Sequence, residues 1–474
     1  MSQGWTIPPE LEAEMTPGVR AFVEMLLARI EQLEAENREL RERVRTLELK
    51  LGRVARRGQD DDDAGGAGDV PPQRPAKQPP RKRGGQPGHP KHERPLVPTE
   101  QCDEVHVLKP DHCRRCGKEL HGDDPQPLRH QVFELPEIKL EVTEYQRHRL
   151  TCSCGTSTCA ALSDGVPEGQ SGPGLTAFVA LLMGMFRQSK RRVSLFCETL
   201  FGHSMSPGTV VKLQNQATEA LRPEYDRLAA ALPAENVVHA DETGTKQENR
   251  NAWIWTFVAK TFTLFAIRPT KAACVIKELL GEAYDGVVIS DRAKTYHWVE
   301  RHQWCWAHLK RDFETMAARQ GKAGKIGQRL LDATYRLFHD CHRRRDGTIT
   351  ERGFLRRMTQ LRGEVESALQ AGSRCADRAT AATCNELLDY ADNLWLFVYN
   401  TDVAPTNNAA ERSLRHAVIW RGLSFGTQSA AGSRFVETLL TVLETCRQQG
   451  HNAFAFLTSA LTRHFQPTAS LCGV

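Results

Sequence analysis

A seven-residue repeat of hydrophobic positions runs along the chain from about residue 19 to residue 52. The d positions are Leu26, Leu33, Leu40 and Leu47, and the a positions are Val23, Ile30, Asn37, Val44 and Leu51. β-Branched residues at a with leucine at d favour two strands, and a single asparagine at a fixes their register. The pattern predicts a homodimer through a parallel coiled coil over 19–52. A single amphipathic helix packed on the protein's own body is the alternative.

The hydrophobic pattern stops in the next segment, 53–100, where glycine, proline and charged residues dominate. Apolar residues are too few there to offset the entropy of folding, so we expect a disordered basic linker. Its basic run is Arg81, Lys82 and Arg83, followed by two glycines. Basic residues beside glycines can follow the minor groove of DNA closely, which makes these three residues candidate DNA contacts. A purely solvated linker is the alternative.

Two pairs of cysteines flank a stretch of alternating polar and apolar residues in 101–165. The pairs are Cys113 with Cys116 and Cys152 with Cys154, and the alternation between them runs from 132 to 150. Two cysteine turns joined by strands predict a zinc-ribbon-like module in which four thiolates hold one structural Zn²⁺. The second pair has one intervening residue where two are usual, so Cys159 or His112 could replace one ligand. Buried or idle thiols are the alternative.

Helical periodicity follows over 170–233. A strongly apolar helix precedes Ser189, a second helix ends near Gly202, and a third begins near Thr209. Two helices joined by a short glycine-containing turn are typical of a helix-turn-helix, so the segment predicts DNA binding. The candidate DNA contacts are Lys190, Arg191, Arg192 and Lys212. An ordinary helical bundle is the alternative.

The pattern then changes to short β-rich runs. In chain order, these are strands at 236–241, 252–259 and 261–267, a helix at 271–280, and strands at 286–291 and 303–308. With a further helix expected before the last strand, this order is that of the RNase H-like fold, in which the first and fourth strands are neighbours. Asp241 and Asp291 end those two strands, so their carboxylates should meet at one edge of a cleft. The fold class expected is therefore α+β and multidomain, with an α/β catalytic core.

Long helical stretches follow up to about Asn400, and a further helix begins within 404–415 with Glu411 in its first turn. Two aspartates and a glutamate brought together can hold two Mg²⁺ or Mn²⁺ ions for phosphoryl transfer. Each residue alone has a simpler explanation as a turn residue or a helix cap. The run Asn408-Ala-Ala-Glu411, for example, fits a capping box. The joint placement on this strand order favours the metal site.

Charge and composition limit the other classes of protein. Lys and Arg total 63 against 58 acidic residues, a net charge of +5, with basic runs concentrated in the first half. Local basic tracts of this kind favour nucleic acid as a partner. No apolar run approaches the roughly 20 residues of a membrane span, and no secretory signal is evident. Most of the 14 cysteines are scattered singly, which indicates a reducing compartment.

The sequence resembles the transposases of bacterial insertion-sequence family sixty-six. The resembling text is His239-Ala-Asp-Glu-Thr-Gly244, Ser290-Asp291, Cys305-Trp-Ala-His-Leu-Lys-Arg-Asp-Phe313 and Pro405-Thr-Asn-Asn-Ala-Ala-Glu-Arg-Ser-Leu-Arg415. Gly84-Gly-Gln-Pro-Gly-His89 and the coiled coil also match the layout of that family. The likeness runs from the coiled coil to about residue 455.

The resemblance implies a DDE triad of Asp241, Asp291 and Glu411. It also implies that the core comprises 234–311 and 401–460, with the helices of 312–400 inserted between them. Four further residues fall in the family's motif blocks and could orient the scissile phosphate or the DNA ends: His308, Arg311, Asn407 and Arg415.

The function expected is metal-dependent cleavage of DNA and joining of the freed 3′-hydroxyl to target DNA, without a covalent protein–DNA intermediate. The expected partners are terminal inverted repeats, target DNA, a second copy of the chain and small helper proteins encoded by the same element. The expected place is the bacterial cytoplasm, in association with the nucleoid. A structure-specific nuclease of the same fold and a non-catalytic DNA-binding regulator are the alternatives.

Overall fold

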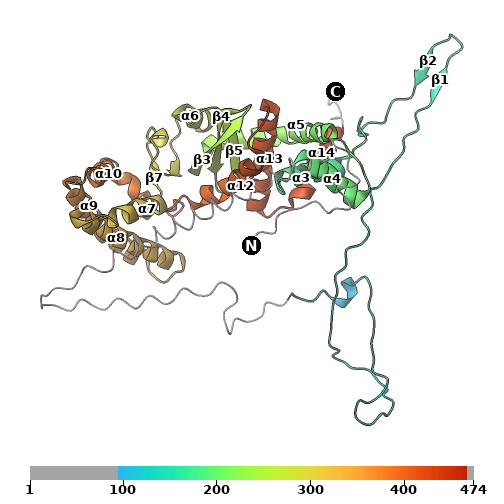
Figure 1. Cartoon of the computed structure of the whole chain (residues 1–474), viewed down its shortest axis with the longest axis horizontal. Helices are drawn as coiled ribbons and strands as arrows, with labels where there is room; N and C mark the ends of the chain where they lie inside the picture. Colours follow the sequence, from blue (N-terminus) through green and yellow to red (C-terminus); the bar gives the residue numbers. More distant parts are fainter. Residues whose placement is uncertain (1–93, 467–474) are drawn as a thin grey trace, which may run out of the picture. The chain divides into compact units, whose positions relative to one another are not determined.

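The computed structural model describes residues 94–466 (Figure 1). The expected coiled coil, most of the expected linker and the run Arg81-Lys82-Arg83 lie outside the described residues. The described chain divides into two compact units, with the boundary between Val132 and Phe133. In the first unit, a 3₁₀ turn η1 (Thr99–Gln101) precedes the turn that carries Cys113 and Cys116.

The second unit opens with a stretch whose expected strands are mostly absent. The residues of 133–148 form no strand, and only β1 (Arg149–Thr151) and β2 (Ser157–Cys159) pair, antiparallel, around the second cysteine turn. The apolar members of the alternation, such as Leu135 and Val142, are exposed. Alternating polar and apolar residues predict a strand only where the apolar face packs against other residues. Here the apolar side chains are exposed, so this condition is not met.

Three helices follow, as the periodicity predicted. They are α3 (Pro173–Gly184), α4 (Lys190–Phe201) and α5 (Pro207–Ala231). Ser189 and Ser206 begin α4 and α5, and each side chain accepts a hydrogen bond from a backbone N–H in the first turn. Gly202 ends α4 in the left-handed conformation, with φ +62°, which a residue with a side chain rarely adopts. The third helix, α5, starts at Pro207, two residues before the start near Thr209 that the sequence pattern indicated.

A five-stranded mixed sheet forms the centre of the second unit. Its strands are β3 (Val237–Gln247), β4 (Arg250–Val258), β5 (Thr263–Arg268), β6 (Val287–Ser290) and β7 (His302–Trp304). Their order is β5-β4-β3-β6-β7, with β3 parallel to β6 and β6 parallel to β7. The first and fourth strands are thus neighbours, so that prediction is confirmed, as is the hairpin of β4 and β5.

Three details of the sheet differ from the prediction. First, β3 continues well past Asp241, because the residues after it pair with β4 down to Gln247 and Arg250. Second, β6 and β7 are joined by a single 3₁₀ turn, η3 (Lys294–Tyr296), where a helix was expected. Third, β7 ends at Trp304, and Trp306 already begins the next helix, so the apolar run beyond β7 packs as a helix.

Alternate residues of the strands pack against different helices, because successive side chains point to opposite faces of a sheet. On one face, Trp255 and Phe257 of β4 pack with α6 (Ala273–Leu280) in one hydrophobic cluster. On the other face, Ile254 of β4 and Phe265 of β5 pack with α13 (Ala430–Gln449), α14 (Ala453–Phe465) and α3. Figure 1 shows α13 running alongside β5.

The outer edge of the sheet is covered by side chains of α13. The backbone N–H groups of Thr263, Phe265 and Ile267 on β5 donate to Thr445 Oγ1 (3.2 Å), Thr441 Oγ1 (2.9 Å) and Glu437 Oε2 (2.9 Å), respectively. Four residues of helix rise about 6 Å, close to the length of two residues of strand, so the two spacings match. The edge donors of β5 are therefore satisfied by a helix.

Five helices lie between β7 and the helix that carries Glu411. They are α7 (Trp306–Ala317), α8 (Gly321–Arg345), α9 (Glu351–Ser373), α10 (Arg378–Asp389) and α11 (Leu396–Tyr399). Their apolar faces share one core with Val287 and Ile289 of β6. The next helix is α12 (Asn408–Ser424). Within the described part of the chain, no helix combines the length and the apolar character that a membrane span requires.

Candidate active site

The parallel pairing of β3 and β6 places Asp241 and Asp291 at the same end of the two strands. The paired residues end with His239 opposite Ile289, and each aspartate follows two residues later on its own chain. Both carboxylates are fixed by short local hydrogen bonds: Glu242 N donates to Asp241 Oδ1 (2.9 Å), and Ala293 N donates to Asp291 Oδ1 (3.0 Å). The carboxyl ends of neighbouring parallel strands are where α/β sheets place their functional groups.

Asn407 attaches the start of α12 to the middle of the sheet. It is 1% exposed; its Nδ2 donates to the Ala240 carbonyl (2.8 Å), and its Oδ1 lies 3.1 Å from His239 Nδ1. Asn407 is the N-cap of α12 but forms no side-chain cap hydrogen bond, because its amide is used on β3. The capping box suggested for Asn408 and Glu411 is therefore not formed. Glu411, in the first turn of α12, is left available for another role.

Glu411 faces the first turn of α7. Its Oε1 lies 3.5 Å from His308 Nδ1 and 3.6 Å from an Arg311 terminal nitrogen. Neither contact has the geometry of a hydrogen bond, and both Glu411 Oε1 and His308 Nδ1 are buried atoms without a hydrogen-bond partner. The buried oxygen and nitrogen are thus held close together with their bonding capacity unused, although leaving such atoms unsatisfied is costly.

Electrostatics join the three acidic residues into one site. Burial and the negative charges of Glu242, Asp291 and Glu411 raise the pKa of Asp241 to about 7. Burial also raises the pKa of Glu242, although its carboxylate accepts a hydrogen bond from the buried Tyr296 hydroxyl (2.6 Å). Clustered carboxylates that repel each other in this way are stabilised by a cation. Sequence reasoning missed Glu242 because it is one residue beyond the aspartate that matched the motif.

The acidic cluster fits a divalent cation. Carboxylate oxygens are the ligands that Mg²⁺ and Mn²⁺ prefer, and a bound cation would offset the repulsion that raises the pKa of Asp241. The buried Glu411 Oε1 also has no hydrogen-bond partner and could serve as a ligand. The residues that would hold such an ion are Asp241, Asp291 and Glu411.

The remaining sequence-predicted residues are placed as follows. Arg311 and Arg415 are exposed on α7 and α12, and Arg415 lies one turn after Glu411 on the same helix. Lys212 is exposed near the start of α5, and Lys190, Arg191 and Arg192 form the exposed first turn of α4. Gln214, two residues after Lys212 on α5, is 5% exposed and cannot face DNA there.

Each cysteine pair lies in a tight turn closed by a glycine with positive φ. Gly117 N donates to Cys113 O and Gly155 N donates to Cys152 O, both at 2.9 Å. Hydrogen bonds from the backbone of Cys116 and Arg115 lower the pKa of Cys113, and hydrogen bonds from Thr156 lower that of Cys154 to about 7. Lowered pKa values favour the thiolate that binds metal. The two turns belong to different units, so the joint set of Cys113, Cys116, Cys152 and Cys154 stays a prediction.

A buried chain of hydrogen bonds supports the turn after β6. Trp304 Nε1 donates to His302 Nδ1 (3.1 Å), so the proton of His302 is on Nε2, which lies 2.7 Å from Ser290 Oγ. Ser290 Oγ in turn donates to the Asp291 carbonyl (2.8 Å). This chain fixes the backbone that carries Asp291, and it requires a neutral His302.

The neutral state of His302 predicts a pH-dependent stability. Burial lowers the pKa of His302 to about 3 from an ordinary value of 6.5. Between these values the unfolded chain binds a proton there and the folded chain does not, so the free energy of unfolding falls as the pH falls. The expected slope from this group is about 1.4 kcal/mol per pH unit. Urea unfolding at pH 5.5 and 4.5 measures it, because the unfolded imidazole is almost fully protonated in that range. His302→Gln, which does not titrate, should show a smaller loss, and equal losses would contradict the assignment.

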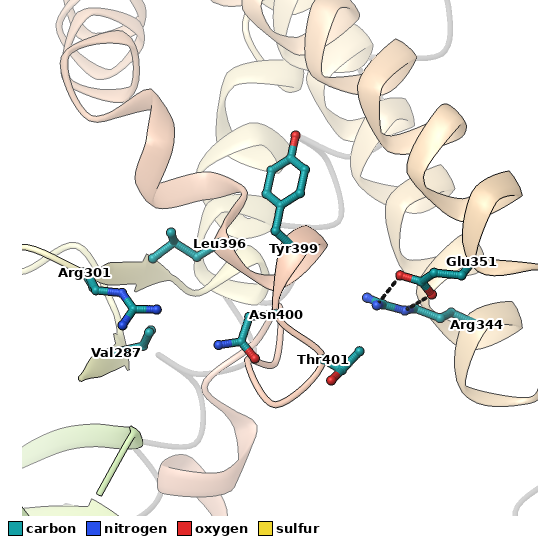
Figure 2. A pocket seen from close by; sticks show the side chains of 8 residues that line it. All are labelled: Val287, Arg301, Arg344, Glu351, Leu396, Tyr399, Asn400 and Thr401. Atoms are coloured by element: carbon teal, nitrogen blue, oxygen red, sulfur yellow. Dashed lines mark hydrogen bonds and ion pairs between the residues drawn. The ribbon is translucent and has the colours of Figure 1, made fainter. Parts of the chain in front are cut away.

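A separate pocket lies at the other end of β6, near Val287, and is unrelated to the acidic cluster (Figure 2). It is an open hollow of about 370 Å³. Arg344 there is paired with Glu351, with nitrogen–oxygen distances of 3.0 and 2.6 Å, while Arg301 points toward the hollow from the strand side. Because one of its two arginines is already neutralised by a partner, the pocket is a weaker candidate than the carboxylate cluster.

Comparison with known proteins identifies the family of this chain. The family model described as "Transposase IS66 family" matches residues 168–434, which is more than half of the chain and includes Asp241, Asp291 and Glu411. The chain is similar to the uncharacterized protein y4hP of Sinorhizobium fredii, with 26% identity over 408 residues, covering 76% of this chain and 72% of the relative. It is also similar to the uncharacterized protein y4jO of the same organism, with 23% identity over 192 residues, covering 40% of this chain and 57% of that relative. The chain therefore belongs to the IS66 family of transposases.

Proposed function

We propose that this protein is a DDE-type transposase that cleaves DNA at the ends of an insertion sequence and joins the freed ends to target DNA. The observation that carries the proposal is that Asp241, Asp291 and Glu411 lie close enough to interact. Burial and the charge of Glu242 raise the pKa of Asp241 to about 7, and the charges of Asp291 and Glu411 add to the shift. The strand order β5-β4-β3-β6-β7 supports an RNase H-like core, in which the helices of 312–400 form an insertion.

The roles of the residues follow from their positions. Asp241, Asp291 and Glu411 would hold two Mg²⁺ or Mn²⁺ ions, which when bound activate water or a 3′-hydroxyl and stabilise the leaving oxygen. Asn407 keeps Glu411 beside the two aspartates by bonding α12 to β3. His308 and Arg311 stand next to Glu411 and orient its carboxylate. The exposed guanidinium groups of Arg311 and Arg415 would attract the DNA phosphates.

The other modules would recognise DNA and assemble the complex. The basic first turn of α4 and the exposed Lys212 would contact the phosphates of the terminal inverted repeats. Arg81, Lys82 and Arg83 would add minor-groove contacts, and the zinc-ribbon-like module would hold a structural Zn²⁺. The 19–52 segment would make the homodimer, and helper proteins of the same element would complete the assembly.

The test is a strand-transfer assay with full-length protein, labelled DNA carrying the inverted repeats that flank its gene, and plasmid target DNA. With Mg²⁺ or Mn²⁺, we expect 3′-end cleavage and covalent joining of the labelled end to the target; with a chelator, neither product should form. Metal-dependent hydrolysis without joining would instead identify a nuclease. DNA binding without either product would identify a regulator.

A further inference from the structure

The thiol of Cys305 lies beside the contact between His308 and Glu411. Cys305 Sγ, His308 Nδ1 and Glu411 Oε1 all lie within 4.8 Å of one another. Among residues 94–466, this is the group of potential ligands dense enough to hold one metal ion. Cys305 lies between β7 and α7 and has no role in the proposed DDE site.

Two of these three ligand atoms lack a hydrogen-bond partner, although Glu411 Oε1 also lies 3.6 Å from an Arg311 guanidinium nitrogen. His308 Nδ1 and Glu411 Oε1 are both buried atoms that form no hydrogen bond. Burying polar atoms without partners costs free energy, and a ligand between them would recover it. The two atoms lie 3.5 Å apart, a separation that suits two ligands of one small ion.

The backbone around the group is held from both sides. Cys305 is the N-cap of α7, and His308 N donates to Cys305 O (3.0 Å), so the thiol and the imidazole share one helical turn. Asn407 N approaches Cys305 Sγ at 3.1 Å, and Trp306 N donates to Pro405 O at 2.9 Å. These contacts fix the start of α7 against the start of α12, so little rearrangement is needed to bring the three ligands around an ion.

The ligand types differ from those of the acidic cluster. Mg²⁺ takes oxygen ligands, whereas a thiolate, an imidazole and a carboxylate suit Zn²⁺ and other softer divalent ions. Three protein ligands leave a fourth tetrahedral position open to water. Glu411 would belong to both sets of metal ligands. Cys305, which is 1% exposed, would not be a ligand in a site made of oxygen atoms alone.

We propose that Cys305, His308 and Glu411 form a second, thiophilic metal site, for Zn²⁺ or a similar ion, that competes with the acidic cluster for the carboxylate of Glu411. Binding replaces the thiol proton, which leaves to solvent, and involves no change of oxidation state. An ion in this site withdraws Glu411 from Asp241 and Asp291. The consequence for activity rests on the proposed function above, whereas the metal site itself does not.

Metal binding is tested with Co²⁺ as a spectroscopic probe of the full-length protein. A Co²⁺–thiolate bond gives an intense charge-transfer absorption, and we compare the wild type with Cys305→Ser and Cys305→Ala. The matched control is Cys384→Ser, which changes another fully buried thiol. The cysteine turns near 113 and 152 are present in every variant and cancel in the difference. Both Cys305 variants should lose one Co²⁺ equivalent, with affinity at that site reduced about 100-fold or more, since losing even an outer-sphere partner costs 10–100-fold. The control should not change.

Equal Co²⁺ binding by the wild type and both Cys305 variants, with folding verified by circular dichroism, would overturn the site. Inhibition of strand transfer by Zn²⁺ then tests whether the metal site affects the proposed transposase activity. In the strand-transfer assay with Mg²⁺, Zn²⁺ should inhibit the wild type at concentrations at least about tenfold below those needed for Cys305→Ser. A Co²⁺ difference with no Mg²⁺-dependent activity would retain the metal site and reject the transposase mechanism. Strand-transfer activity with no difference in Co²⁺ binding between the variants would retain the transposase mechanism and reject the metal site.

Discussion

Asp241→Asn is expected to reduce DNA cleavage by about 10³–10⁴-fold, the range found when a catalytic carboxylate is neutralised. Asparagine keeps the shape of the side chain but removes the charge that holds a cation. The same substitution should not destabilise the metal-free protein. A pKa of about 7, against 3.8 for an unperturbed aspartate, means that ionising Asp241 costs the folded state free energy. The variant should therefore melt at the same temperature or higher, with the difference growing as the pH rises from about 4 to about 7 and staying constant above that.

The measurements are single-turnover cleavage of labelled element ends and thermal unfolding at pH 6 and pH 8 without metal. The matched control is Asp285→Asn, an exposed aspartate just before β6, which should cleave at the wild-type rate. Two results would reject the assignment of Asp241: cleavage at the wild-type rate by Asp241→Asn, or a loss of activity that is accounted for by unfolding.

Asn407→Ala is expected to have the second-largest effect, because this side chain bonds the start of α12 to β3. Removing it leaves the Ala240 carbonyl and His239 without their partner, which costs about 1–3 kcal/mol of stability. Released from β3, the first turn of α12 would no longer hold Glu411 in place. Loss of such a supporting partner lowers metal affinity or activity by about 10–100-fold.

Mg²⁺ titration of the cleavage rate separates the two consequences of this change. A positioning role raises the Mg²⁺ concentration needed for half-maximal rate, whereas a purely structural role lowers the amount of folded protein and leaves that concentration unchanged. The control is Asn408→Ala, the exposed neighbour in the same helix. If Asn407→Ala and Asn408→Ala require the same Mg²⁺ concentration, Asn407 does not position Glu411.

The hydrophobic pattern was sufficient to predict the central sheet. Buried apolar runs ending near Asp241 and Asp291 predicted two strands, and the order of elements in the RNase H-like fold predicted that these strands are neighbours. The position of Glu411 in the first turn of a helix was equally readable from the residues before it. These features depend on local pattern and on a small number of allowed topologies.

Features that depend on contacts between residues far apart in the sequence could not be predicted from the local pattern. The continuation of β3 past Asp241 depends on its pairing with β4, which allows polar residues such as Thr243 to lie in a strand. The use of the Asn407 amide on β3, in place of capping α12, depends on a contact between residues 167 positions apart. Alternation near Val142 predicted strands where the described chain offers nothing to cover them.

The covering of β5 by α13 also determines how this sheet can meet another protein molecule. Open strand edges invite pairing with extended segments of other chains, which leads to strand addition or aggregation. Here the donors at residues 263, 265 and 267 are already occupied by Glu437, Thr441 and Thr445. At high local protein concentration, copies of this chain are therefore prevented from polymerising edge to edge through β5.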